Sequence, residues 1–224
     1  MLKYFEHIKK MNLGTKRMFF ILTLFVLVSE IEVNAQNFMG NIDLGFRAGL
    51  NMTTITGDKE SGLEVGFAAG AGGKFHISEN SSLSAELLYT TGGMNANKSI
   101  DTTGVKVKIY DKIHLHYLAI PIVYQYYFTD ILGIEIGPQV GFCLGGKEKN
   151  KIGNESWVPS KLSPTDYNVF DCGILAGIYT NNITQENDFL ISLRVYFGLT
   201  NVMKYERNNK NICIQFGIGY IIGK

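Results

Sequence analysis

Five charged side chains stand out in this 224-residue chain because each one interrupts an otherwise apolar or glycine-rich segment. They are Arg47, Glu86, Glu135, Asp171 and Arg194. Apolar residues alternate with small or polar ones in each segment, and the charge always belongs to the small or polar set. The chemistry open to such residues is ion pairing, because a charge removed from water is costly unless an opposite charge compensates it. We therefore predict a network that joins Arg47 and Arg194 to the three carboxylates.

Other patterns that could do chemistry are weak. His114 and His116 are two positions apart, so on a strand they point the same way as a candidate metal pair, but no third ligand is near in sequence. Solvated or interfacial histidines are the favoured interpretation. Residues 70–74 (GAGGK) resemble a phosphate loop but lack its full spacing and the Ser/Thr after the lysine. No Ser-His-Asp arrangement stands out, and we expect no enzymatic activity, no metal and no other cofactor.

The elements that position these residues are indicated by period-two alternation, which sends successive side chains of a β-strand to opposite faces. In residues 134–144, for example, Ile134 and Ile136 lie on the apolar face and Glu135 on the other. The same pattern appears in eight segments, at residues 42–52, 63–77, 82–91, 112–128, 134–144, 168–180, 189–200 and 211–222. Each segment has about ten residues or more, enough to cross a hydrocarbon layer at the tilt of a barrel strand.

The first 35 residues are typical of a secretory leader rather than of a folded domain. Basic residues precede an apolar run at residues 18–28, and this run of about 11 residues is too short for a spanning helix. Val33-Asn34-Ala35 then provides a cleavage site. We predict a signal peptide at residues 1–35 and one barrel domain at residues 36–224.

Alternation alone does not decide between a soluble β-fold and a membrane barrel, because both have one apolar face. The number and length of the segments and the leader favour the membrane. We predict an all-β fold, an eight-stranded antiparallel up-and-down transmembrane β-barrel, with apolar faces toward lipid and charged, glycine-rich faces toward the lumen. Side chains can fill so narrow a lumen, so the charge network is expected to be a plug rather than a channel lining.

The connections between the segments alternate in length, which supports the same fold. Residues 76–81, 129–132 and 181–188 are short connections, whereas residues 53–62, 92–111, 145–167 and 201–210 are longer. Short periplasmic turns and long outer loops are typical of outer-membrane barrels, so both termini are expected to be periplasmic. The two longest connections, 92–111 and 145–167, are polar and are expected to be surface-binding loops, not strands.

The counts over the whole chain exclude some functions. The formal net charge is +1 at pH 7, which argues against nucleic acid as a partner. Three cysteines cannot all pair with one another, so no disulfide framework is expected. By alternation Cys143 and Cys213 point inward and Cys172 points outward. The favoured interpretation is that all three thiols are small apolar side chains that fill space.

Several segments, in the right order, are similar to those of PorT-like outer-membrane β-barrel proteins of Gram-negative bacteria. The similar stretches are YLAIPIVYQYYF at 117–128, GPQVG at 137–141, FDCG at 170–173, RVYFGLTN at 194–201 and QFGIGY at 215–220. The resemblance implies an eight-stranded barrel, with protein secretion as the role of the namesake members. Ala119 and Gln125 stand where the family pattern has Glu and Lys, so one inward charge pair is expected to be missing.

The sequence therefore predicts an exported protein of the cell outer membrane with a side-chain-filled lumen. Its expected role is structural or interactive, through the outer loops, with a link to envelope biogenesis or secretion implied by the resemblance. Expected partners are outer-membrane lipid, the barrel-assembly machinery and a protein at the outer loops. Two alternatives stay open at this point: a narrow porin for small solutes or ions, and a soluble periplasmic lipocalin-like binder of apolar ligands.

Overall fold

The computed structural model describes residues 42–57, 61–102, 105–129, 131–153, 155–163, 165–181, 189–205 and 208–222. The signal peptide at residues 1–35 and its boundary with the barrel domain lie outside these ranges, so both stay predictions. Among the described residues, no helix is long and apolar enough to cross a bilayer.

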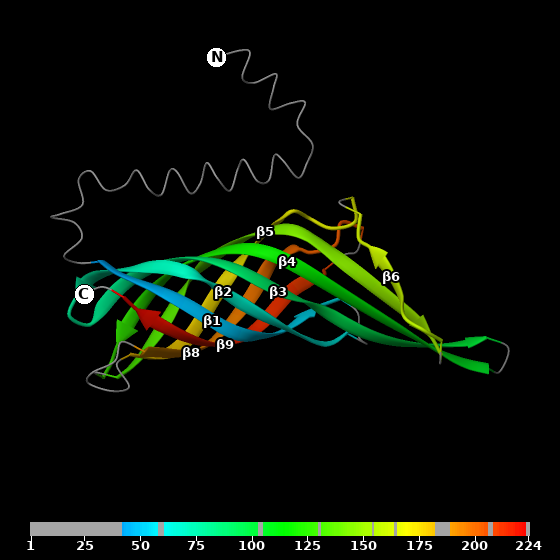
Figure 1. Cartoon of the computed structure of the whole chain (residues 1–224), viewed down its shortest axis with the longest axis horizontal. Coiled ribbons are helices and arrows are strands. Elements are labelled where there is room, and N and C mark those ends of the chain that lie inside the picture. Colours follow the sequence, from blue (N-terminus) through cyan, green and yellow to red (C-terminus); the bar gives the residue numbers. More distant parts are fainter. Residues whose placement is uncertain are drawn as a thin grey trace, which may run out of the picture. The chain divides into compact units, whose positions relative to one another are not determined.

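Nine β-strands form within the described residues, and eight of them close into a ring (Figure 1). The strands are β1 (Ile42–Ile55), β2 (Ser61–Ser78), β3 (Ser81–Thr102), β4 (Val105–Tyr127), β5 (Leu132–Ile152), β6 (Val158–Lys161), β7 (Phe170–Asn181), β8 (Phe189–Asn201) and β9 (Lys210–Ile221). All pairs are antiparallel, and β1 pairs with β9 to close the ring, while the short β6 pairs with β5 outside it. The prediction of an all-β, eight-stranded antiparallel up-and-down barrel is confirmed.

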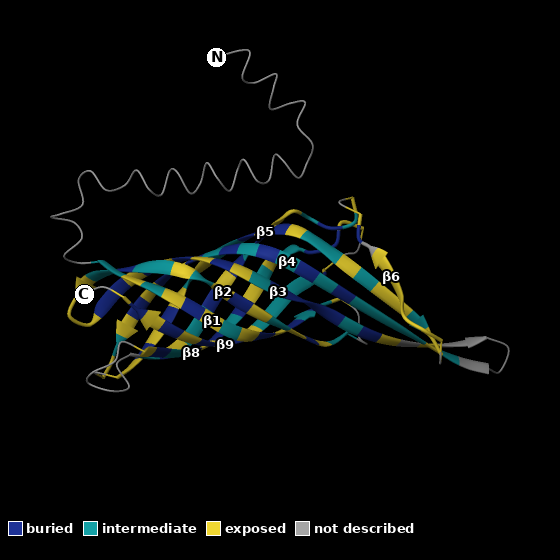
Figure 2. Cartoon of the chain, in the orientation of Figure 1, coloured by how far each residue is buried: buried dark blue, intermediate teal, exposed yellow. Residues whose placement is uncertain are grey.

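The alternation in the sequence decides which way each side chain faces (Figure 2). On β1, Leu44, Phe46 and Leu50 are exposed on the outer surface, whereas Arg47 and Asn51 are buried. Cross-strand partners share a face, so the exposed apolar side chains of neighbouring strands form a band on the outside of the ring. A soluble lipocalin-like barrel needs these faces inside, so that alternative is wrong.

Three strands on one side of the barrel are longer than the sequence predicts. Residues 92–111 and 145–167 are expected to be loops, but β3, β4 and β5 continue into them and β6 lies within the second. The pairing is unbroken along the added length, with Ile109 of β4 opposite Ile152 of β5. Residues 105–110 (VKVKIY) alternate β-branched and polar side chains, which is typical of a strand. Their lysines, however, give the stretch the composition of a loop. The expectation of loops is therefore wrong for much of both stretches.

The two ends of the barrel differ. The adjoining ends of β2 and β3, of β4 and β5, and of β7 and β8 lie at one end, together with the last residues of β9 (Figure 1). At the other end β3, β4 and β5 project beyond the ring with β6 at their edge (Figure 1). We call this projecting sheet, the described parts of residues 93–116 and 145–161, the extension.

Candidate functional site: a charge cluster in the lumen

Two arginines and two carboxylates from four separate strands meet inside the barrel. Arg194 of β8 donates from Nε to Glu135 Oε1 at 2.6 Å and from Nη2 to Glu135 Oε2 at 2.9 Å. It also donates from Nη1 and Nη2 to Glu86 Oε2 and Oε1, at 2.7 and 2.9 Å. Arg47 of β1 donates from Nε to Glu86 Oε1 at 3.2 Å. We call these four residues the plug.

Strand register explains why these side chains meet. Glu135 of β5 lies opposite Gly177 of β7, and Gly177 lies opposite Arg194 of β8. A Cβ atom at Gly177 would lie 3.1 Å from Arg194 Cγ, so the missing side chain leaves room for the arginine to cross β7. Gly72 does the same for Glu86, whose Cγ would lie 2.7 Å from a Cβ at residue 72.

Three uncharged polar side chains complete the hydrogen bonds of the plug. Gln125 donates from Nε2 to Glu135 Oε2 at 2.9 Å, and Ser82 Oγ donates to Gln125 Oε1 at 3.2 Å. Arg47 Nη1 donates to Ser192 Oγ. Gln125 stands where the resemblance suggested a missing charge, and here it serves Glu135 as a neutral donor. Ser192 could have been predicted from the sequence, because it lies two residues before Arg194 and therefore on the same inward face of β8.

The plug is almost dry. Arg194 is 0 % exposed and Glu135 is 2 % exposed. Removal from water costs several kcal/mol for each ion, and here paired Arg–carboxylate hydrogen bonds and a balance of two positive and two negative groups offset that cost. Each carboxylate is held by donors of the barrel itself. The arrangement therefore ties β1, β3, β5 and β8 together across the lumen rather than presenting a reactive group.

Asp171, which the sequence groups with the plug, lies elsewhere. Its carboxylate accepts from Thr200 Oγ1 at 2.6 Å and from Asn211 Nδ2 at 3.4 Å. It is six residues along β7 from Gly177, which places it about 20 Å along the strand from the level of Arg194. Alternation gives the inward direction of a side chain but not its level along the barrel, and this is why the grouping needs correction.

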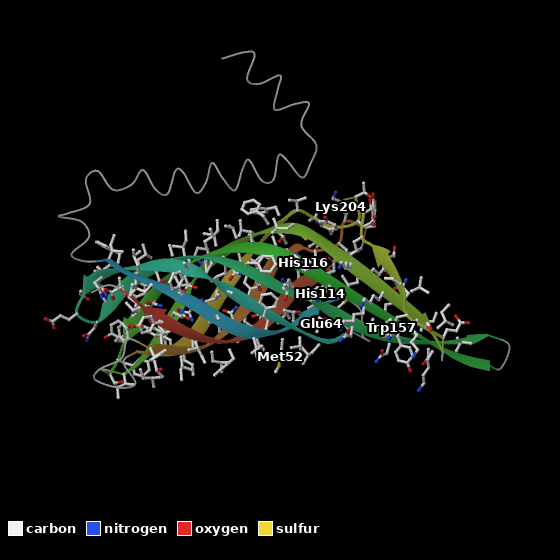
Figure 3. All side chains as sticks on the ribbon, in the orientation of Figure 1. Met52, Glu64, His114, His116, Trp157 and Lys204 are labelled. Carbon is white, nitrogen blue, oxygen red and sulfur yellow. The ribbon has the colours of Figure 1, made fainter. Side chains whose placement is uncertain are left out.

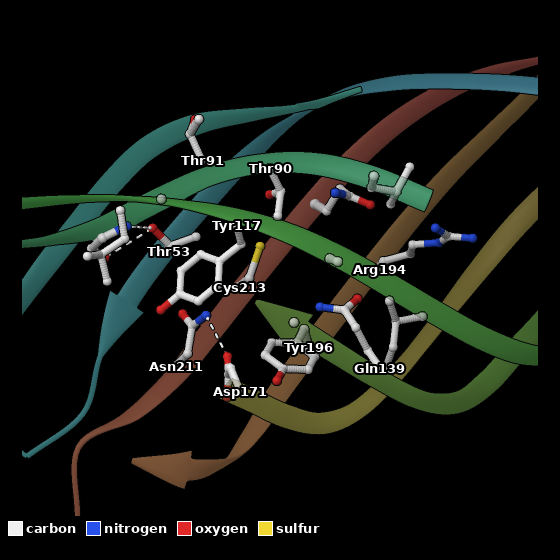
Figure 4. A pocket seen from close by; sticks show the side chains of 18 of the residues that line it. Thr53, Thr90, Thr91, Tyr117, Gln139, Asp171, Arg194, Tyr196, Asn211 and Cys213 are labelled. Carbon is white, nitrogen blue, oxygen red and sulfur yellow. Dashed lines mark hydrogen bonds between the residues drawn. The ribbon is translucent and has the colours of Figure 1, made fainter. Parts of the chain in front are cut away.

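A cavity lies on each side of the plug. The cavity toward the extension is lined by Arg194, Gln139 and Asp171 among others (Figure 4), and the opposite cavity by Arg47 and Glu86 among others. Each has a volume of about 50 Å³, room for roughly three or four water molecules. The plug thus lies between two small chambers of the lumen.

Beyond the cavity that lies toward the extension, apolar side chains from the strand ends and the long connections pack together. The members of this cluster are Ile55, Met94, Ile113, Leu115, Tyr117, Cys143, Leu162, Tyr167, Val202 and Met203. Tyr167 and Met203 also form an isolated antiparallel bridge, which joins two of the long connections. The lumen is therefore narrowed at this end as well as at the plug.

The two histidines lie on the outer face of β4, where Figure 3 labels them with Glu64. His114 Nδ1 is 3.3 Å from Glu64 Oε1, and His116 Nδ1 is 2.6 Å from Tyr89 Oη. Lys112 Nζ also pairs with Glu64, at 3.0 Å from Oε2. In the part of the chain that the structure describes, no group of three or more His, Cys, Asp or Glu residues is placed to hold a metal ion.

All three thiols are free. Cys143 is buried in the apolar cluster, and Cys213 packs inside against Val123, Leu175 and Tyr196. Cys172 pairs in register with Val140 of the lipid-facing side and is half-buried. The cysteines therefore act as small apolar side chains in this fold.

Comparison with known proteins gives the family. Among solved structures, the chain is similar to the attachment invasion locus protein Ail of Yersinia pestis (11 % identity, 81 % of this chain and 99 % of that chain, TM-score 0.44). It is also similar to neisserial surface protein A (13 % identity, 80 % and 97 %, TM-score 0.45) and to OprG of Pseudomonas aeruginosa (11 % identity, 82 % and 97 %, TM-score 0.38). No curated protein matches the chain. The family model described as "Outer membrane protein beta-barrel domain" matches residues 34–204, and the chain belongs to this family of outer-membrane proteins.

Proposed function

We propose that this protein is a non-conducting outer-membrane barrel whose role is to hold an interaction surface outside the cell. The plug supports the first part, because its four charges bind one another across the lumen instead of lining an open path. In a narrow porin the ion pairs of this cluster would have to separate to open a path for solutes. The porin alternative is therefore less well supported than a closed barrel.

The observation that carries the interaction role is the extension. The long connections of outer-membrane barrels face outside, so we place the extension on the cell surface. Its far part exposes apolar side chains: Ile152 is 51 % exposed, Trp157 46 % and Val158 65 % (Figure 3 labels Trp157). Exposed apolar side chains beyond the reach of lipid are typical of protein-binding surfaces, where Trp is a frequent anchor.

A photocrosslinking amino acid at Val158 tests the interaction role in intact cells. We expect a crosslinked product of discrete mass from Val158 and none of that mass from the lipid-facing control position Ile174. The same ladder of products from both positions, or none from Val158, would contradict a specific partner at the extension.

Conductance tests the closed lumen. The purified protein, refolded and inserted in a planar bilayer, is expected to show no unitary current steps in salt solution. Steps that recur in wild type and change in size when Arg47 is replaced by serine would show that ions pass the plug, and would favour the porin.

The finer assignments are proposals of the same kind. The matching family model is the general outer-membrane barrel domain, so a role in secretion or envelope biogenesis rests on the resemblance of the sequence stretches to PorT-like proteins. We also infer export by a cleaved signal peptide at residues 1–35 and insertion by the barrel-assembly machinery. We infer that the protein is not an enzyme, because its buried carboxylates in the plug are fully engaged with arginine and glutamine.

A further inference from the structure

The outward face of the extension is basic. On β4 this face continues from the lipid-facing Leu118 through the two histidines to Lys112. On β5, Lys147 lies opposite His114, and Lys149 lies opposite Lys112. The nearby acidic residue Glu148 lies opposite Ile113, on the other face of the sheet.

This arrangement is unfavourable for the sheet itself. Like charges directly opposite each other on neighbouring strands are destabilising, and Lys112 and Lys149 form such a pair. Glu64 contacts Lys112 and His114, so it compensates the β4 row. Lys147 and Lys149 are exposed, and no ion pair to either is found within the described ranges. The β5 row therefore offers its positive charge to a group outside the protein.

The level of these lysines identifies that group. From Tyr126 to His116 the outward face of β4 runs for about 25 Å along the membrane normal, taking 3.3 Å per residue and a tilt of about 40°. This is the height of the apolar band of an outer-membrane barrel. Lys147 and Lys149, level with His114 and Lys112, then lie roughly 5 to 10 Å beyond the band, in the zone of the lipid headgroups.

We propose that Lys147 and Lys149 form a binding site for the phosphate groups of lipids in the outer leaflet. Lysine is a common phosphate ligand, and its long side chain can reach back toward the membrane surface. Lipid is favoured over a protein partner because the basic face continues the lipid-facing surface of β4, whereas the exposed apolar Ile152 belongs to the other face with Ile109. This site does not depend on the proposed interaction role.

Two matched double variants of the full-length protein test the site. K147Q/K149Q removes two lysines at the headgroup level, and K108Q/K151Q removes two lysines of the same face that lie farther out. The centres of the two pairs are about four residues or 13 Å apart along the strands, and the nearest two lysines, Lys149 and Lys151, are about 7 Å apart. The outer pair therefore lies farther from the headgroups by more than the Debye length of about 8 Å at physiological salt, measured between centres. Each protein in detergent micelles is titrated with lipid A that carries two phosphates and with the same lipid after phosphate removal, and bound lipid is counted by native mass spectrometry.

We expect wild type to bind the phosphorylated lipid more tightly than the dephosphorylated lipid. K147Q/K149Q should weaken this binding by about 25-fold, because each lysine near an anionic surface contributes a factor of about five. K108Q/K151Q is expected to weaken it by about twofold at most, because screening separates that pair from the headgroups. Equal binding of the two lipids would overturn the site. Equal losses in both variants would also overturn it, and would assign the basic face to a soluble or protein anion instead. An unchanged gel shift between boiled and unboiled samples shows that each variant is folded.

Discussion

Removal of Arg194 is the sharpest test of the plug. Arg194 makes four hydrogen bonds to two carboxylates, at 2.6 to 2.9 Å, and is 0 % exposed. In Arg194→Met, a side chain of similar length keeps most of the volume but leaves Glu135 with the neutral donor Gln125 and leaves Glu86 with Arg47. Two buried carboxylates then face one arginine.

The expected loss is about 3 to 5 kcal/mol of unfolding free energy, the usual cost of removing one partner of a buried ion pair. Four separate hydrogen bonds to charged groups would sum to more, but such bonds are not additive within one network. Most of the loss comes from the uncompensated carboxylate of Glu135. Restoring the balance of charge should therefore recover stability.

The assay is denaturant unfolding of the refolded barrel in lipid vesicles, followed by circular dichroism and by gel migration. Arg194→Met, Glu135→Gln and the double variant form a thermodynamic cycle. We expect the double variant to be more stable than Arg194→Met alone, because Glu86 and Arg47 then form a neutral pair. Leu193→Met, on the lipid-facing side of the same strand, is the control and should change little. A loss below about 1 kcal/mol for Arg194→Met, as for an exposed ion pair, or a double variant as unstable as the sum of the two single variants, would refute the reasoning.

Two further predictions concern the faces of the strands. Ile136→Arg places a charge on the lipid side, where Ile136 is 55 % exposed; we expect a loss of about 2 to 4 kcal/mol in vesicles near the midplane, and normal stability would show that this face is not in lipid. Gly177→Leu puts a Cβ 2.7 Å from the carbonyl oxygen of Leu193 and 3.1 Å from Arg194 Cγ; overpacking should cost about 1 to 3 kcal/mol, measured by the same unfolding assay. The neighbouring Ala176→Leu points outward and should be tolerated, so equal losses at 176 and 177 would argue against crowding in the lumen.

The direction of each side chain could be predicted from the sequence because a strand has a strict period of two. Arg194 and Glu135 face the lumen for this reason, and the outward faces of β1 and β5 are as expected. Level along the barrel could not be predicted, since it depends on register between strands that are far apart in the chain. Asp171 shows the difference: its inward direction follows from the sequence, but its partners Thr200 and Asn211 do not.

The extension could not be predicted from the sequence for a different reason. Its lysines and asparagines give residues 92–111 the composition of a loop, although residues 105–110 keep the alternation of a strand. Strands inside a membrane must be apolar on one face, whereas strands beyond it need only pair with each other. The change to polar residues on β3 and β4 therefore indicates where these strands leave the membrane, not where the strands end.

The plug and the extension are connected through the strands that they share. Beyond the ring, the extension has no closed set of neighbours, so its order depends on how firmly β3, β4 and β5 are held at their base. Glu86 lies on β3 and Glu135 on β5, and Arg194 of β8 binds both, reaching Glu135 past β7 and Glu86 across the lumen. Gln125 adds β4, through its hydrogen bond to Glu135. The charges of the plug thus also hold in place the three strands that carry the basic face and Ile152, and this gives a buried ion cluster a role other than conduction.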